Sequence, residues 1–164
     1  DVEAAFKKAD VRSGDAVLLR TGWGDDERYY KLGENYILQS PYYAKEATAR
    51  IAEIMKGKGC DLFFYDTANM GFPKAHLIPE WVKAKPRKKG WPSAEAKAYV
   101  DTYTTEKIIQ DWEGVLPMGP ARIVSIGCIV NCGAITKPRV KTISLPLKVK
   151  GAPVTPCSVI AIED

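Results

Sequence analysis

The chain has 164 residues and a formal net charge of +4, with 46% hydrophobic and 27% charged residues. These values are ordinary for a globular protein, and the length suits one domain with a substantial core. No apolar run approaches the roughly 20 residues that span a bilayer. We therefore expect a single domain over residues 1–164 and no membrane partner.

The cysteines indicate the compartment. Cys60, Cys128, Cys132 and Cys157 lie in helical or apolar stretches and do not form the framework of a small secreted protein. Buried, reduced thiols of this kind are typical of cytoplasmic proteins. The spacing of Cys128 and Cys132 does not match a zinc knuckle, and no second pair accompanies them. The cysteines therefore predict a cytoplasmic protein.

The first predicted element is a strand at residues 15–20, where a short apolar run lies between glycines. Residues 23–39 are polar, aromatic and interrupted by glycine, so we expect a loop there. A helix is expected to begin at Ser40 and Pro41, because serine is a preferred N-cap and proline suits the first helical position.

That helix is predicted to end at Gly57 or Gly59, since glycine is the usual residue after a helix. Its apolar residues recur at helical spacing. Residues 62–65 follow as a buried strand, with Asp66 and Thr67 at its carboxyl end. This order of strand, helix and strand resembles a βαβ unit and predicts an α/β fold.

Residues 68–120 are expected to form an atypical, less regular insert with helices at about 93–103 and 107–112. Within it, residues 83–89 hold five of the 24 basic residues of the chain. A solvated surface loop is the expected role of this run, and an acidic partner is the alternative. Nucleic-acid binding is not expected.

Three further strands are predicted after the insert. Residues 121–130 are apolar and rich in β-formers, which indicates a central strand. Residues 141–149 alternate polar and apolar side chains, and residues 157–162 form the last strand.

Two segments resemble the putative cyclase family, whose best-known members are kynurenine formamidases and related metal-dependent amide hydrolases. They are Gly14–Trp23 (GDAVLLRTGW) and residues 140–164 (VKTISLPLKVKGAPVTPCSVIAIED). The family's metal-binding His-x-Gly-Thr-His-x-Asp signature precedes its Gly-Asp-x-Val-Leu strand and is not in this chain. The resemblance implies the swivelling β/β/α cyclase-like fold. This chain is expected to be its C-terminal portion, incomplete without an upstream segment or a partner chain.

The resemblance implies metal-dependent hydrolysis of an amide, lactam or ester bond in a small-molecule substrate. A divalent metal, zinc or manganese, would be held largely by residues outside this chain. The expected partner is a complementary N-terminal chain or further copies in a homo-oligomer. The alternative is a non-catalytic cyclase-like subunit, a binding or assembly module with a degenerate metal site.

Two residues are predicted to be catalytic. His76 is the single histidine of the chain, and a lone histidine is often structural. The resemblance implies a role for it, because the family places a histidine after the Asp-Thr strand end, where it assists the metal-water chemistry. Asp66 stands at a strand's carboxyl end, where α/β folds present functional groups. Its alternative role is to cap the following turn.

Other side chains are candidates for binding. Arg20, Trp23 and Tyr65 are expected to line an anionic or aromatic substrate pocket, and the alternative for the aromatic residues is a place in the core. The family's downstream glutamate ligand falls at a glycine or a valine of this chain in two alternative alignments. Neither side chain binds a metal, so either the site is degenerate or Cys128 supplies a ligand by another geometry.

Overall fold

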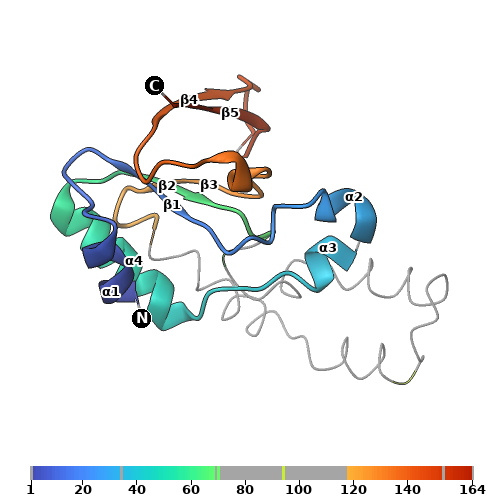
Figure 1. Cartoon of the computed structure of the whole chain (residues 1–164), viewed down its shortest axis with the longest axis horizontal. Coiled ribbons are helices and arrows are strands. Elements are labelled where there is room, and N and C mark those ends of the chain that lie inside the picture. The colour runs from blue at the N-terminus through green and yellow to red at the C-terminus, as the bar shows by residue number, and fades with distance from the viewer. Residues whose placement is uncertain are drawn as a thin grey trace.

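The computed structural model describes residues 2–33, 35–68, 70, 94, 118–152 and 154–163. The helices in these residues are α1 (Val2–Lys8), α2 (Arg28–Leu32), α3 (Asn35–Leu38), α4 (Lys45–Lys58) and the 3₁₀ helix η2 (Cys132–Ala134). The strands are β1 (Ala16–Leu19), β2 (Leu62–Tyr65), β3 (Val124–Ile126), β4 (Lys141–Pro146) and β5 (Cys157–Ile162) (Figure 1). None of these helices combines the length and the apolar character that a membrane crossing requires.

The first three strands form a parallel sheet in the order β1-β2-β3. Leu19 of β1 lies beside Tyr65 of β2, and Leu62 lies beside Val124 of β3. Parallel neighbours need a crossover connection, and helix α4 supplies it between β1 and β2. The predicted α/β class and its strand–helix–strand unit are confirmed.

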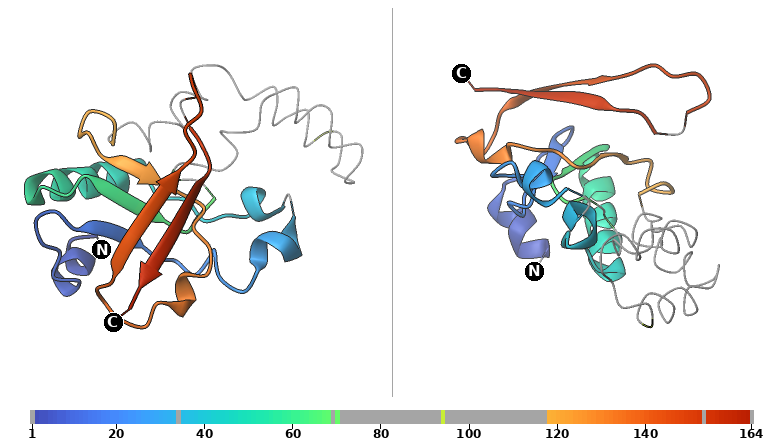
Figure 2. Two further views of the ribbon diagram at one scale, coloured as in Figure 1. Left: turned by 90° about the horizontal axis from the view of Figure 1, so that it is seen from above. Right: turned by 90° about the vertical axis from the view of Figure 1, so that its right-hand side faces the viewer.

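Helices α1 and α4 cover one face of this sheet, and the core lies between them and β2 (Figures 1 and 2). Ile51 and Met55 of α4 and Phe63 of β2 are completely buried there. Val17 and Leu19 of β1 pack against the same core. Side chains alternate between the two faces of a strand, so Leu18 and Phe64 are directed to the opposite face.

Helix α4 begins later than the sequence indicates. The expected start at Ser40 and Pro41 is wrong, because the helix runs from Lys45 to Lys58. The Ser40 hydroxyl instead accepts the N–H of Ala68 at 2.9 Å and donates to its neighbour's carbonyl. A contact distant in sequence therefore replaces the local cap. The end is confirmed: Gly59 follows the helix at φ 68°, the left-handed region that glycine tolerates.

Two other sequence expectations fail. Residues 23–39 are not all loop, because they include the short helices α2 and α3. Residues 121–130 do not form a central strand, because β3 lies at an edge and spans only Val124–Ile126. The helices expected at 93–103 and 107–112 lie outside the described residues, apart from position 94.

Strands β4 and β5 form a separate antiparallel hairpin, which lies over the sheet face opposite α4 (Figure 2). Ile143 pairs with Ile160, and Ser144 pairs with Val159. The strands predicted at 141–149 and 157–162 are thus present, the first of them shorter than expected. The hairpin and the parallel sheet together form two β layers with helices on one outer side.

Candidate functional site

The carboxylate of Asp66 organises the carboxyl end of the parallel sheet. Asp66 follows β2 and is completely buried. Both of its oxygens accept the N–H of Thr21 at 2.9 Å, and Oδ2 also accepts the N–H of Gly22 at 2.7 Å. The Thr21 hydroxyl donates to Oδ1 at 2.8 Å. A buried carboxylate is tolerated when it is hydrogen-bonded in this way, and here the bonds fix the loop after β1.

Aromatic side chains pack around this loop. The hydroxyl of Tyr36, in α3, donates to the backbone carbonyl of Asp66 at 3.3 Å. The Tyr36 ring stacks on Trp23, with centroids 5.6 Å apart. The Arg28 guanidinium lies over the Trp23 ring, 4.9 Å from its centroid, and it also donates to the Gly22 carbonyl. Cation–π contact with Arg28 and stacking with Tyr36 both stabilise the position of the Trp23 ring.

The loop after β3 packs directly on the loop after β1. The carbonyl of Gly24 accepts the N–H of Asn131 at 3.1 Å. A Cβ atom at position 24 would lie 2.1 Å from the carbonyl oxygen of Ile129, so only glycine fits there. On the other side of β2, the N–H of Cys128 donates to the Thr67 carbonyl. The carboxyl ends of all three parallel strands therefore meet in one cluster.

Asp25 extends this cluster to η2. Its carboxylate accepts the N–H of Gly133 at 2.8 Å and an Nη of Arg20 at 3.0 Å. Burial works against ionisation of this carboxyl, but the Gly133 N–H and the Arg20 guanidinium outweigh it and hold the Asp25 pKa below its ordinary value. The ion pair is partly exposed at Arg20 and mostly buried at Asp25.

Two thiols lie beside the cluster. The Cys128 sulfur donates to the Ala68 carbonyl at 3.3 Å, and partial burial raises the pKa of this thiol. Burial, with the nearby carboxylates of Asp66 and Asp25, raises the pKa of the Cys132 thiol to about 11. Both thiols are therefore poor nucleophiles at neutral pH.

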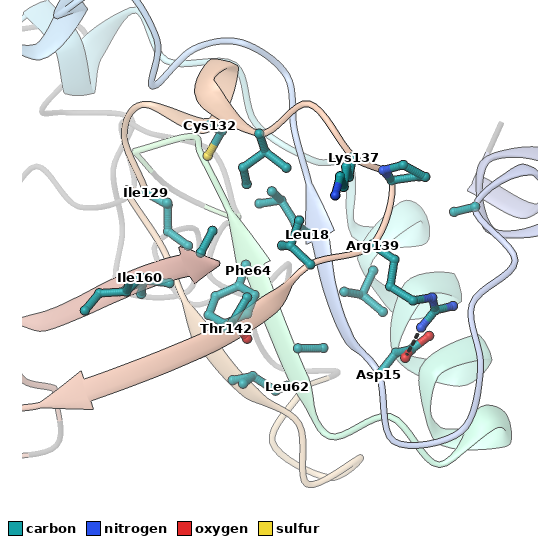
Figure 3. A pocket seen from close by; sticks show the side chains of 18 of the residues that line it. Asp15, Leu18, Leu62, Phe64, Ile129, Cys132, Lys137, Arg139, Thr142 and Ile160 are labelled. Carbon is teal, nitrogen blue, oxygen red and sulfur yellow. Dashed lines mark hydrogen bonds and ion pairs between the residues drawn. The ribbon is translucent and has the colours of Figure 1, made fainter. Parts of the chain in front are cut away.

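A cavity of about 880 Å³ separates the parallel sheet from the hairpin (Figure 3). Its floor is apolar, with Leu18, Leu62 and Phe64 of the sheet, and Thr142 of β4 faces them. Charged residues stand at one end, where Arg139 bonds to the carboxylate of Asp15. The face of the sheet opposite the helices is thus only partly covered.

One comparison with known proteins connects this geometry to a family. The model of the family described as Putative cyclase matches residues 1–67. This segment of the chain is therefore similar to the cyclase family. The match spans α1, β1, α4 and β2 and ends at Thr67, directly after Asp66. No curated protein and no solved structure matches the chain significantly.

The cyclase match includes the three predicted binding residues, and each of them makes a different contact in the structure. Tyr65 packs on the core side of the sheet, where its ring stacks with Phe63. Burial raises the pKa of Tyr65 to about 12. Arg20 pairs with Asp25 near η2, and Trp23 stacks on a different tyrosine. Of the predicted catalytic pair, Asp66 lies in the cluster and His76 lies outside the described residues.

The described residues do not fit the divalent metal that the cyclase family implies. A catalytic zinc takes three protein ligands and a water. In the part of the chain that the structure describes, no three His, Cys, Asp or Glu side chains are grouped to hold a metal ion. The oxygens of Asp66 are already engaged by the loop after β1, and the Cys128 thiol donates to the Ala68 carbonyl.

Sequence reasoning missed the residues that build the cluster. Thr21, Asp25 and Tyr36 were not candidates, although each is bonded within it. A signal was present in the glycines at positions 22 and 24, directly after the first strand. Gly22 adopts φ 82° and donates to Asp66, and Gly24 allows the close backbone approach. Paired glycines at a strand's carboxyl end indicate such a junction.

We predict that Asp66→Asn destabilises the protein by about 3 kcal/mol in urea unfolding. The amide keeps the shape but replaces an acceptor oxygen with a donor, which leaves buried N–H groups unpaired. Thr21→Val removes one hydroxyl donor and should cost about 1 kcal/mol. The matched control is Asp61→Asn, at an exposed position before β2, which should change stability by less than about 0.5 kcal/mol. Equal stabilities of the Asp66 and Asp61 variants would contradict this role.

The lowered pKa of Asp25 predicts a pH dependence of stability. A carboxyl whose pKa is lower in the folded state stabilises the fold above its ordinary value of 3.8, and this contribution is lost as pH falls through the folded pKa. The free energy of unfolding should therefore fall less steeply between about pH 5 and pH 2 in Asp25→Asn than in the unmodified chain. Thermal unfolding across this range measures both slopes, and identical slopes would refute the prediction.

Proposed function

We propose that this chain is a member of the cyclase family and takes part in hydrolysis of an amide, lactam or ester bond in a small molecule. The observation that carries the proposal is where the family match ends. It covers β1, α4 and β2 and stops at Asp66 and Thr67, the sheet edge at which α/β proteins place their reactive groups. The buried hydrogen bonds of Asp66 make this edge rigid, as a catalytic scaffold requires.

In this proposal the described residues bind and orient the substrate, and His76 carries out the proton transfer. Asp66 is a positioning residue, because both of its oxygens are bonded to the loop after β1. That loop carries Trp23, whose stacked ring would offer a flat apolar surface to a substrate. Arg20, half-exposed beside Asp25, would attract an anionic group. His76 would transfer a proton to or from the reacting group.

The family implies a divalent metal, zinc or manganese, which would polarise the carbonyl and activate water. The described residues supply no three-ligand group for it, so in this proposal the metal is held largely by residues outside this chain. The partner would be a complementary N-terminal chain or a further copy. We derive no step of the reaction through the metal.

The second candidate function is a non-catalytic cyclase-like subunit that acts in binding or assembly. The observation in its favour is the donor set: in the described ranges the carboxylates of Asp66 and Asp25 are fully engaged in holding loops. A scaffold that has lost its chemistry keeps such structural bonds without needing free reactive groups. Proton-transfer activity at His76 separates the two candidates.

We predict that His76→Asn lowers kcat by about 10²- to 10⁴-fold, the contribution of general acid–base catalysis. The reaction is assayed on small aromatic amides, lactams and esters with added Zn²⁺ or Mn²⁺, with and without an upstream segment carrying the metal signature. Thermal unfolding of the same variant should match the unmodified protein.

A structural histidine predicts the reverse result. Its loss would cost about 1–3 kcal/mol of stability, with turnover unchanged or absent throughout. Asp61→Asn is the control for activity, since Asp61 is exposed at the opposite end of β2 from the cluster. A destabilised His76 variant with undiminished turnover would end the catalytic proposal and favour the assembly module.

A further inference from the structure

A cavity separates the two β layers because their facing residues differ in size. The sheet side carries the large side chains of Leu18, Leu62 and Phe64, whereas the hairpin side carries the small pair Thr142 and Ala161 (Figure 3). Packed sheets normally lie about 10 Å apart, with side chains of both faces interdigitating. Small side chains on one face cannot fill that distance. The space of about 880 Å³ follows from this mismatch.

The size and lining of the cavity suit a small apolar molecule. Its volume lies within the range of about 300–1,000 Å³ that is usual for ligand sites. Ile129, Ile135 and Val140 continue the apolar lining beyond the sheet. Close-packed interiors leave few spaces much larger than a water molecule. An apolar body placed here would cover hydrophobic surface of both layers.

Two carboxylates at the rim of the cavity are already engaged. The guanidinium of Arg139 bonds to the Asp15 carboxylate (Figure 3). The Glu163 carboxylate accepts the Thr136 hydroxyl at 2.6 Å and the N–H groups of Thr136 and Lys137. These bonds occupy the two acidic groups and the Arg139 guanidinium within the protein itself.

Lys137 provides a cation at the same rim. Its side chain lines the cavity on the side where Arg139 lies (Figure 3). None of the ion pairs between described residues includes it. The Glu163 pKa lies below its ordinary value chiefly because of the Thr136 hydrogen bond, and the Lys137 ammonium is the weakest of the causes. This ammonium therefore has donors to offer to an anion from outside the chain.

We propose that the cavity binds a medium-chain aliphatic carboxylate. The chain of this ligand would lie over Leu18 and Phe64, and its carboxylate would meet the ammonium group of Lys137. The apolar lining supplies the affinity for the chain, and Lys137 fixes the direction in which it enters.

The charges at the rim restrict the head group of the ligand to a single negative charge. Asp15 and Glu163 line the same cavity as Lys137, so a phosphate dianion would meet repulsion as well as attraction. A neutral head group would gain nothing from the ammonium. Polar groups along the chain would lose their hydrogen bonds to water against Leu18 and Phe64. A monocarboxylate with an unbranched apolar chain meets these conditions.

The test is isothermal titration calorimetry of the full chain with decanoate below its micelle concentration. One decanoate per chain is expected. Ala161→Phe fills the cavity from the hairpin side and should weaken binding by about tenfold or more. Ser158→Phe is the matched control, because Ser158 lies on the same strand opposite Leu145, on the other face of the hairpin. It should bind like the unmodified chain.

The head group is tested separately. Lys137→Gln should weaken decanoate binding about fivefold, the contribution of a partly exposed ion pair, and should leave the binding of decanol unchanged. Lys148→Gln is the control, since Lys148 is exposed and does not line the cavity. Thermal unfolding without ligand confirms that each variant is folded. Leu18→Trp narrows the same space from the sheet side and repeats the test should Ala161→Phe unfold.

Three results would overturn the proposal. The first is the absence of decanoate binding, or the binding of many molecules per chain. The second is an equal loss of affinity in Ala161→Phe and Ser158→Phe, which would place the ligand outside the cavity. The third is an equal effect of Lys137→Gln on decanoate and decanol. Binding is measured without turnover, so the result is independent of the proposed hydrolysis.

Discussion

The bonded carboxylate of Asp66 is the interaction on which the rest of the described structure depends. A charge buried at the end of a parallel strand is costly, and only several donors at short distance make it favourable. The loop after β1 supplies them from Thr21 and Gly22. Their bonds lock β1 to β2 beyond the last residue of the sheet.

The consequences extend in two directions from the loop. Toward α3, the ring of Trp23 in this loop stacks on Tyr36, and the Tyr36 hydroxyl donates to the backbone carbonyl of Asp66. Toward η2, it places Asp25 where the Gly133 N–H and Arg20 meet. The segment after β3 can approach only because position 24 is glycine. One carboxylate therefore sets the geometry of three chain segments that are distant in sequence.

The sequence allowed the strand–helix–strand unit to be predicted, because its signals are local. Apolar runs marked β1 and β2, and Gly59 marked the end of α4. The helix start predicted at Ser40 was wrong because a serine hydroxyl that can cap a helix can equally accept a distant N–H, here that of Ala68. Local patterns do not distinguish those two outcomes.

The candidate site was predicted less well for a related reason. Asp66 was a candidate because a strand end is visible in sequence, but its hydrogen-bond partners lie about 45 positions away and belong to no motif. Arg20 and Tyr65 were expected in one substrate pocket because of their side-chain types. In the structure Tyr65 lies on the core side of the sheet, and Arg20 pairs with Asp25. The pairing of Leu19 with Tyr65 decides this, and it appears only once the register is known.

Amide hydrogen exchange at Thr21 and Gly22 tests the central claim most directly. Both residues follow β1 in a loop, where exposed amides exchange freely. If the Asp66 carboxylate holds them, their N–H groups should exchange as slowly as those of β2, only through opening of the sheet. Exchange at the rate of an unprotected loop, with β2 still protected, would show that the carboxylate does not lock this edge.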